Sequence, residues 1–103
     1  MTKPKNAYTY RKAFSSELDR NVACLRLVDS LRERKIKFVK GWPIGKAHPD
    51  YQDFLLDVQR INRLGNEPYE LYTQVYSKKQ IMPSEIPYNI SEALSLEGLV
   101  LVG

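Results

Sequence analysis

The sequence predicts an α+β fold in which helices pack on one sheet to form a two-layer sandwich. Three observations carry this prediction. Residues 18–31 repeat apolar side chains at spacings of three and four, as an amphipathic helix does. Residues 7–14, 36–39 and 53–58 hold the aromatic, β-branched or apolar side chains of strands. Glycine and proline punctuate the chain between several of these segments.

The chain has 103 residues and a mass of 12.0 kDa, so we expect one domain. A chain of this size buries roughly 60 to 65% of the surface that it exposes when unfolded, which leaves a thin core. Its 43% hydrophobic and 11% aromatic residues can also cover a subunit interface, and a homo-oligomer is expected. We expect residues 1–6 to form a loose leader, 7–82 the sandwich and 83–103 a C-terminal extension.

The first helix is predicted to begin after Ser15 and Ser16, because a serine hydroxyl can cap the exposed amides. Glu17 and Asp19 then meet the positive end of the helix. It should end near Lys35, with a strand following at once. The apolar stripe that we expect to face the sheet comprises Leu18, Val22, Leu25, Val28 and Leu31.

A loop is predicted at residues 41–49, which hold two glycines and two prolines, before the strand at 53–58. A second helix is predicted over residues 66–76, because Asn66 can cap its start and Pro68 suits its first turn. Three tyrosines share its helical spacing. We expect them to pack on the sheet or between subunits rather than to form a platform for stacked bases: Tyr69, Tyr72 and Tyr76.

The last third of the chain is predicted to consist of short elements. Residues 80–82 suit a strand, Ser91 can cap a helical turn that runs to Leu96, and residues 99–102 suit a final strand. The predicted order is β-α-β-β-α-β followed by a short helix and strand. This is the order of a ferredoxin-like sandwich.

The chain has one cysteine and one histidine, which limits its chemistry. Cys24 has no partner for an intramolecular disulfide, and we expect it to be a core residue. His48 is expected to be an exposed loop residue, with proton transfer beside Asp50 as the alternative. The sequence therefore predicts neither a metal site nor a cofactor.

The net charge of +4 permits an anionic partner. Because basic and acidic residues alternate along the chain, the first interpretation is a solvated surface; a phosphate-bearing small ligand is the alternative, and nucleic acid is disfavoured as a partner. The sequence shows no apolar signal region and no stretch that spans a bilayer. We expect a cytoplasmic protein with no membrane partner.

Four segments resemble the phage-encoded S-adenosylmethionine lyases, over residues 10–82. They are Ala13-Phe14-Ser15, Asn21 within the helix, Phe38 to Trp42, and Asp53 to Leu56. The resemblance implies a ferredoxin-like subunit in a trimer, with the ligand bound between neighbouring subunits. It also implies cleavage of S-adenosylmethionine to methylthioadenosine and homoserine lactone, which removes the methyl donor of host restriction and modification systems.

The resemblance also assigns a site, with Asp53 as its catalytic residue. That family has a tyrosine where Trp42 stands and a glutamate where Asp53 stands. An indole face can stabilise a sulfonium cation by about 0.5 to 2 kcal/mol, and a carboxylate can do so through its charge. The alternatives are that Trp42 anchors the core or an interface and that Asp53 is a solvated acid. The implied ligand-binding residues are Ala13, Phe14, Ser15, Asn21, Gly41, Trp42, Asp53 and Phe54.

Three functions of different classes follow. The first is an S-adenosylmethionine lyase. The second is a non-catalytic oligomer that sequesters an adenosine-containing or cyclic nucleotide. The third is a small phage protein that inhibits a host protein through its surface.

Overall fold

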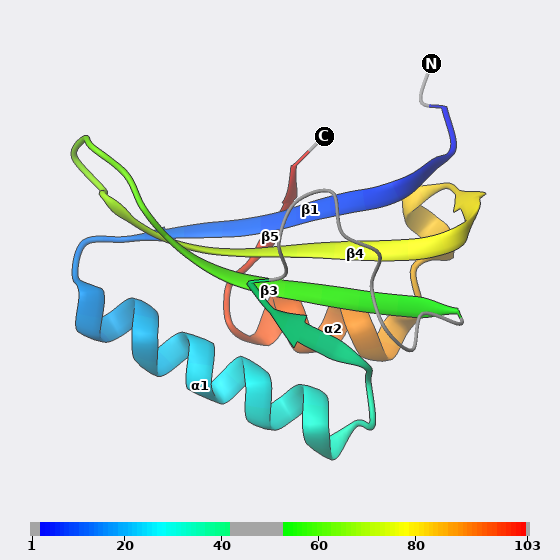
Figure 1. Ribbon diagram of the computed structural model, residues 1–103, viewed down its shortest axis with the longest axis horizontal. Coiled ribbons are helices and arrows are strands. Elements are labelled where there is room, and N and C mark those ends of the chain that lie inside the picture. Colours follow the sequence, from blue (N-terminus) through cyan, green and yellow to red (C-terminus); the bar gives the residue numbers. More distant parts are fainter. Residues whose placement is uncertain (1–2, 42–52, 103) are drawn as a thin grey trace.

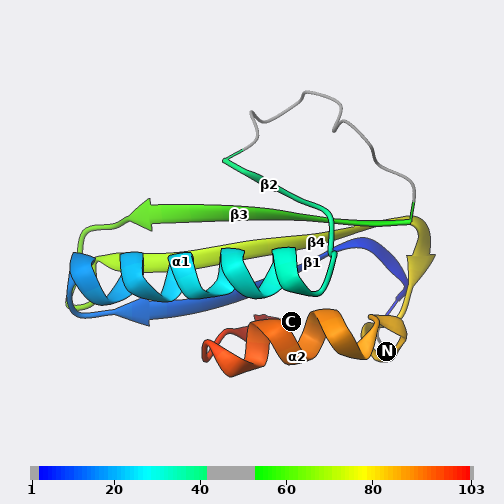
Figure 2. The ribbon, with the colours of Figure 1, turned by 90° about the horizontal axis from the view of Figure 1, so that it is seen from below.

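The computed structural model describes residues 3–41 and 53–102, which form a five-stranded sheet with two helices on one of its faces (Figures 1 and 2). The predicted α+β class is therefore confirmed. In chain order the elements are β1 (Lys5–Phe14), α1 (Glu17–Glu33), β2 (Phe38–Lys40), β3 (Phe54–Asn62), β4 (Tyr69–Ile81), a 3-10 turn η1 (Pro83–Glu85), α2 (Tyr88–Leu96) and β5 (Val100–Val102).

The strand order across the sheet is β2-β3-β4-β1-β5. β2 runs parallel to β3, and the other neighbouring strands are antiparallel. The first strand of the chain therefore lies between β4 and β5, the last two (Figure 1). In the part of the chain that the structure describes, the two outermost strands have only three residues each.

The prediction of a second helix over residues 66–76 is wrong, because these residues enter β4. Their side chains alternate between the two faces of the sheet as a strand requires. Leu71, Thr73 and Val75 are buried beneath the helices, whereas Tyr72 and Tyr76 lie on the other face and are half-buried. The tyrosine spacing of three and four is compatible with either structure. Two features favour the strand: buried and half-buried side chains alternate, and Thr, Val and Tyr have a high β propensity.

The remaining elements have the predicted type, but they begin or end at other residues than predicted. The strand predicted at residues 80–82 is the end of β4. The helical turn predicted at 91–96 begins earlier and becomes α2, and the final strand is β5. The described chain therefore reads β-α-β-β-β-α-β instead of the predicted order.

Helix α1 begins as the sequence predicts. The Ser16 side chain accepts a hydrogen bond of 3.0 Å from the backbone N–H of Asp19. The helix ends at Glu33, two residues short of the predicted Lys35. Lys35 adopts a left-handed backbone conformation with a φ of 58°, and its N–H donates to the carbonyl of Arg32. A left-handed residue closes the last turn and lets the chain turn toward β2.

The face that α1 buries differs from the predicted apolar stripe. Val28 and Leu31 lie in the core as expected. Leu18 and Leu25 are 71% and 65% exposed, so the stripe does not point at the sheet along its first half. The buried positions still repeat at three and four, in a set rotated around the helix: Arg20, Ala23, Cys24, Leu27, Val28 and Leu31.

Arg20 explains why the buried face is not wholly apolar. Its guanidinium is buried and donates to the carbonyl of Ile61 at 3.0 Å and to the side-chain oxygen of Asn62 at 2.6 Å. It also lies 5.4 Å from the ring centroid of Tyr69. These contacts tie the first turns of α1 to the turn between β3 and β4.

The core lies between the helix layer and the sheet. It takes Leu27 and Leu31 from α1, Leu56 from β3, Leu71 from β4 and Leu94 from α2, all with no exposed surface. Both helices therefore use the same face of the sheet. Neither described helix is long and apolar enough to cross a bilayer.

Candidate functional site

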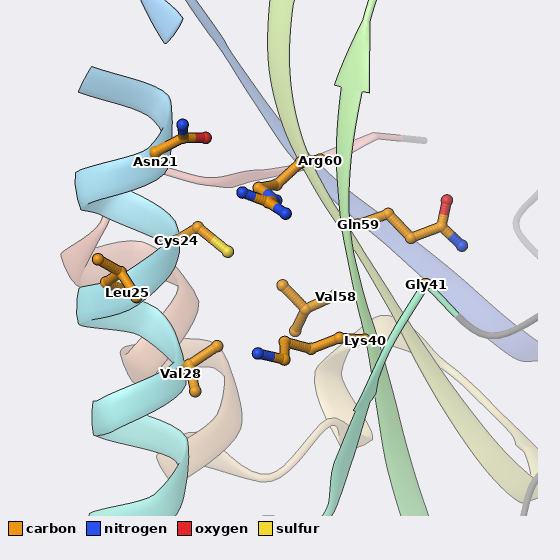
Figure 3. Close-up of a pocket in the computed structure, with 9 residues that line it drawn as sticks. All are labelled: Asn21, Cys24, Leu25, Val28, Lys40, Gly41, Val58, Gln59 and Arg60. Atoms are coloured by element: carbon orange, nitrogen blue, oxygen red, sulfur yellow. The ribbon is translucent and has the colours of Figure 1, made fainter. Parts of the chain in front are cut away.

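A pocket of about 600 Å³ lies between α1 and the strands β2 and β3 (Figure 3). This volume falls within the range of small-molecule sites in proteins. We call it the α1 pocket. Its described lining comprises Asn21, Cys24, Leu25 and Val28 of α1, Lys40 and Gly41 at the end of β2, and Val58, Gln59 and Arg60 of β3.

The local structure explains how these residues meet. The four α1 positions repeat at three and four, so they share one side of the helix. Lys40 pairs with Val58 in the parallel β2–β3 ladder, which directs both side chains to the helix layer. Gly41 then takes a φ of +63° and donates its N–H to the carbonyl of Val58 at 3.0 Å. This conformation suits glycine and ends the strand at the pocket.

Two cations define the electrostatics of the α1 pocket. The Lys40 ammonium and the Arg60 guanidinium both extend from the strands toward α1 (Figure 3). No carboxylate lies among the described residues of the lining, and neither cation forms a salt bridge with a described residue. The pocket is therefore suited to an anion.

Asn21 contributes a fixed polar group. Its side-chain oxygen accepts hydrogen bonds of 3.2 Å from both Nε and Nη2 of Arg20. The amide is thereby oriented by the buried arginine, and its NH2 group remains as a donor. Gln59 differs, because its side chain points away from α1 (Figure 3) and donates to Asp57 on the other face of the sheet at 3.0 Å.

Cys24 lies on the wall of the α1 pocket, and its sulfur points toward the strands (Figure 3). Burial raises the pKa of its thiol, while the charges of Arg60, Lys40 and Arg20 oppose part of that rise. The thiol is therefore protonated at neutral pH. This agrees with its expected role as a packed side chain and does not favour a nucleophile.

The structure divides the predicted site residues among three places. Asn21 and Gly41 line the α1 pocket. Asp53 and Phe54 line a second hollow of about 330 Å³, beside Lys35 and other residues between the start of β3 and the start of α2. Along an extended strand, Phe54 lies about 20 Å from Arg60. Within one subunit, Asp53 is thus far from the pocket that holds Asn21.

The other predicted residues lie elsewhere. Ala13 and Phe14 end β1, and Ser15 begins the connection to α1; none of the three lines either hollow. Trp42 and His48 lie outside the described residues.

The sequence prediction missed Lys40, Cys24 and Arg60 as lining residues. Strand alternation offered a signal for Lys40 and Arg60, because each is a charged residue at a position on the helix-facing side of its strand. The sequence did not show that a hollow remains between α1 and the two strands there. Among the described residues, no group of three or more histidine, cysteine, aspartate or glutamate side chains is placed to hold a metal ion.

Compared with protein-family models, with curated proteins and with solved structures, the chain gives no significant match.

Proposed function

We propose that this chain binds a nucleotide-type ligand in the α1 pocket and sequesters it. The observation that carries the proposal is the pairing of Lys40 with Arg60, two cations on one wall with no carboxylate among the described residues of the lining. Hydrogen bonds between charged partners are roughly twice as strong as neutral ones. A phosphate group placed between Lys40 and Arg60 would compensate both charges.

The opposite wall supplies the apolar surface that a nucleobase or ribose needs. Leu25 and Val28 of α1 lie beside the thiol of Cys24, which stays neutral, and Val58 adds apolar surface on the strand wall between the two cations (Figure 3). Small-molecule sites commonly combine such a wall with a few fixed polar groups. The described lining holds no acid and base pair, which favours a binder over a catalyst.

The sheet also supports a finer fold assignment. Without the short edge strand β2, the order is β3-β4-β1-β5, with α1 between β1 and β3 and α2 between β4 and β5. We propose that the chain is a ferredoxin-like sandwich with one added edge strand. This assignment agrees with the subunit implied by the resemblance to the lyases.

A homo-oligomer, and specifically a trimer, is expected in solution. Leu18, Val22 and Leu25 form an exposed apolar stripe on α1, and Leu25 also borders the α1 pocket. Light scattering at micromolar concentration should return three times the 12.0 kDa mass of one chain. The Leu18→Gln, Leu25→Gln double variant should lower that mass because it places polar groups in the interface. A monomeric wild type would contradict a site shared between subunits.

The S-adenosylmethionine lyase is the second candidate function. The observation in its favour is that Asn21 and Gly41, two residues assigned by the resemblance, line one pocket. A sulfonium is a cation, however, and Lys40 and Arg60 would repel it. The charge of the described lining therefore ranks this function below the nucleotide binder. Methylthioadenosine released from S-adenosylmethionine by the wild type would reverse the ranking.

Charge removal in the α1 pocket tests the proposed function. We expect Lys40→Gln and Arg60→Gln each to weaken the binding of a nucleoside monophosphate or cyclic nucleotide by about 1.5 to 3 kcal/mol, the range for hydrogen bonds to charged groups. This is a loss of roughly ten- to a hundredfold in affinity. Thermal unfolding measures it, because a ligand at a hundredfold excess over Kd adds about 2.7 kcal/mol of stability.

Arg26→Gln is the matched control, because Arg26 pairs with Glu97 on the helix surface and its replacement removes the same charge. It should leave binding unchanged. The rate of Cys24 alkylation gives a second readout. A bound phosphate should cover the thiol and neutralise the cations that oppose the rise of its pKa, and both effects should lower the rate. If no nucleotide shifts the unfolding temperature or slows alkylation, the proposed function is wrong.

A further inference from the structure

The face of the sheet opposite the helices carries polar and aromatic side chains. Alternation along β4 places Tyr72, Gln74 and Tyr76 on this face. In the antiparallel β1–β4 ladder, Tyr72 pairs with Arg11 and Gln74 pairs with Thr9. These five residues share one surface, which we call the open face.

The two tyrosines of the open face are held in place by Gln74. The side-chain amide of Gln74 donates to the Tyr72 hydroxyl at 3.0 Å, and the Tyr76 hydroxyl donates to the side-chain oxygen of Gln74. Thr9 Oγ1 accepts a longer bond of 3.4 Å from the same amide. Burial, Asp57 and Tyr72 raise the pKa of Tyr76, so its ring stays neutral at physiological pH. Two aromatic rings are thus positioned before any ligand arrives.

A charged cluster adjoins Tyr72. Glu70 is only 3% exposed, and its Oε2 accepts from Arg11 Nη2 at 2.7 Å and lies 3.5 Å from Arg63 Nε. Both arginines keep part of their side chains exposed, 39% for Arg11 and 48% for Arg63. Two guanidiniums around one carboxylate leave a net positive charge and several N–H donors for a second anion.

Glu70 also presents an unmet acceptor. Its Oε1 is buried and has no hydrogen-bond partner within the described residues. The buried carboxylate therefore depends on its two arginines for compensation, which keeps both guanidiniums at this end of the open face.

We propose that the open face binds single-stranded nucleic acid, with a base stacked on Tyr72 and a phosphate held by Arg11 and Arg63. Stacking of unpaired bases on aromatic side chains of a sheet is a common mode of single-strand recognition. This function goes beyond ligand binding in the α1 pocket, which lies on the helix side of the sheet. It revises the expectation against nucleic acid, which rested on the alternation of basic and acidic residues along the chain, and it uses tyrosines that the sequence analysis placed on a helix packed against the sheet.

Asp57 pairs with Gln74 across the β3–β4 ladder, and its charge acts at Tyr76. The phosphate is therefore placed at the Arg11 and Arg63 end of the open face, away from Asp57. A duplex is disfavoured as the ligand, because its stacked bases cannot lie on the tyrosine rings.

The test measures fluorescence anisotropy of a labelled twelve-nucleotide single strand at several salt concentrations. Tyr72→Ala should weaken binding roughly tenfold, while Tyr72→Phe, which keeps the ring, should stay within about twofold of the wild type. Arg11→Gln and Arg63→Gln should each weaken binding several-fold and lower the salt slope by about one. Circular dichroism tests whether each variant is folded. If Tyr72→Ala is unfolded, the affinities of the two arginine variants decide whether the proposal holds.

Two variants serve as controls with the same change in charge. Arg32→Gln and Arg26→Gln both lie on the exposed surface of α1, outside the α1 pocket and the open face, so both should bind the strand as the wild type does. If these two lose as much affinity as Arg11→Gln, binding follows overall charge and the proposal is overturned. Absence of binding at low salt, or equal loss for Tyr72→Ala and Tyr72→Phe, also overturns it.

Discussion

Leu27→Ala is expected to lower the free energy of unfolding by about 2 to 5 kcal/mol, the range for removing a buried leucine side chain. Leu27 has no exposed surface and lies in the middle of the face that α1 turns to the sheet. Its removal loses buried apolar area and leaves a cavity that the surrounding leucines fill only in part. Denaturant unfolding, with the midpoint and slope fitted separately, measures the change.

Leu25→Ala is the matched control for this prediction, because it makes the same chemical change two residues away. The apolar stripe in the sequence alone would assign Leu25 a core-like loss of about 2 to 4 kcal/mol. Its side chain is 65% exposed, so we now expect less than about 0.5 kcal/mol when the protein is dilute enough to be monomeric. A larger loss for Leu25→Ala than for Leu27→Ala would mean that α1 is rotated from the orientation described.

Arg20→Leu is expected to cost about 2 to 4 kcal/mol of stability, although leucine is apolar, suits a buried position and has a similar helix propensity. The substitution leaves the carbonyl of Ile61 and the side-chain oxygen of Asn62 without the donor that they share. Hydrogen bonds to charged groups contribute about 1.5 to 3 kcal/mol each, and the substitution removes both. Thermal and denaturant unfolding of the variant measure the loss.

Arg20→Lys separates charge from shape. Lysine keeps the positive charge but lacks the planar fork that reaches Ile61, Asn62 and Asn21 together, so it should recover only part of the loss. Arg26→Leu, at a surface ion pair with Glu97, should cost less than about 1 kcal/mol. If Arg26→Leu proved as damaging as Arg20→Leu, the contacts at the turn between β3 and β4 would not be what stabilises α1.

The N-terminal half of the fold could be predicted because local signals there agree with the tertiary structure. Ser16 caps α1 as the sequence indicates, and the aromatic alternation of residues 7–14 gives β1. The side of α1 that packs on the sheet was harder to predict. Leu18 and Leu25 look like core residues by hydrophobicity, whereas Arg20 does not, and only the acceptors at the turn between β3 and β4 explain why the arginine is buried.

β4 could not be predicted from spacing alone. Tyr69, Tyr72 and Tyr76 fit a helical repeat, and Asn66 and Pro68 resemble a helix start. Pairing with β1 and β3 on both sides holds this segment in the sheet, and it outweighs the local signals of a helix start. The error had a functional consequence, because a helix would turn the tyrosines toward the core and the strand turns Tyr72 and Tyr76 away from it.

The candidate site was predicted only in part for a related reason. Asn21 and Gly41 were identified through a resemblance and do line the α1 pocket. Lys40 and Arg60, which give the pocket its charge, were read as members of a scattered basic surface. Their meeting depends on the parallel pairing of β2 with β3, which brings segments about twenty residues apart into contact.

The position of β1 between β4 and β5 sets the order in which the chain can fold. The β3–β4 hairpin joins neighbouring segments and can form early, whereas β1 pairs with residues of β4 that lie 55 to 76 positions later in the sequence. Its pairing with β4 requires closure of a long loop, whose entropy cost comes before any ladder bond forms. During synthesis, β1 and α1 therefore leave the ribosome with no sheet to join. Until β4 follows, the aromatic face of β1 remains open to chaperones or to other chains.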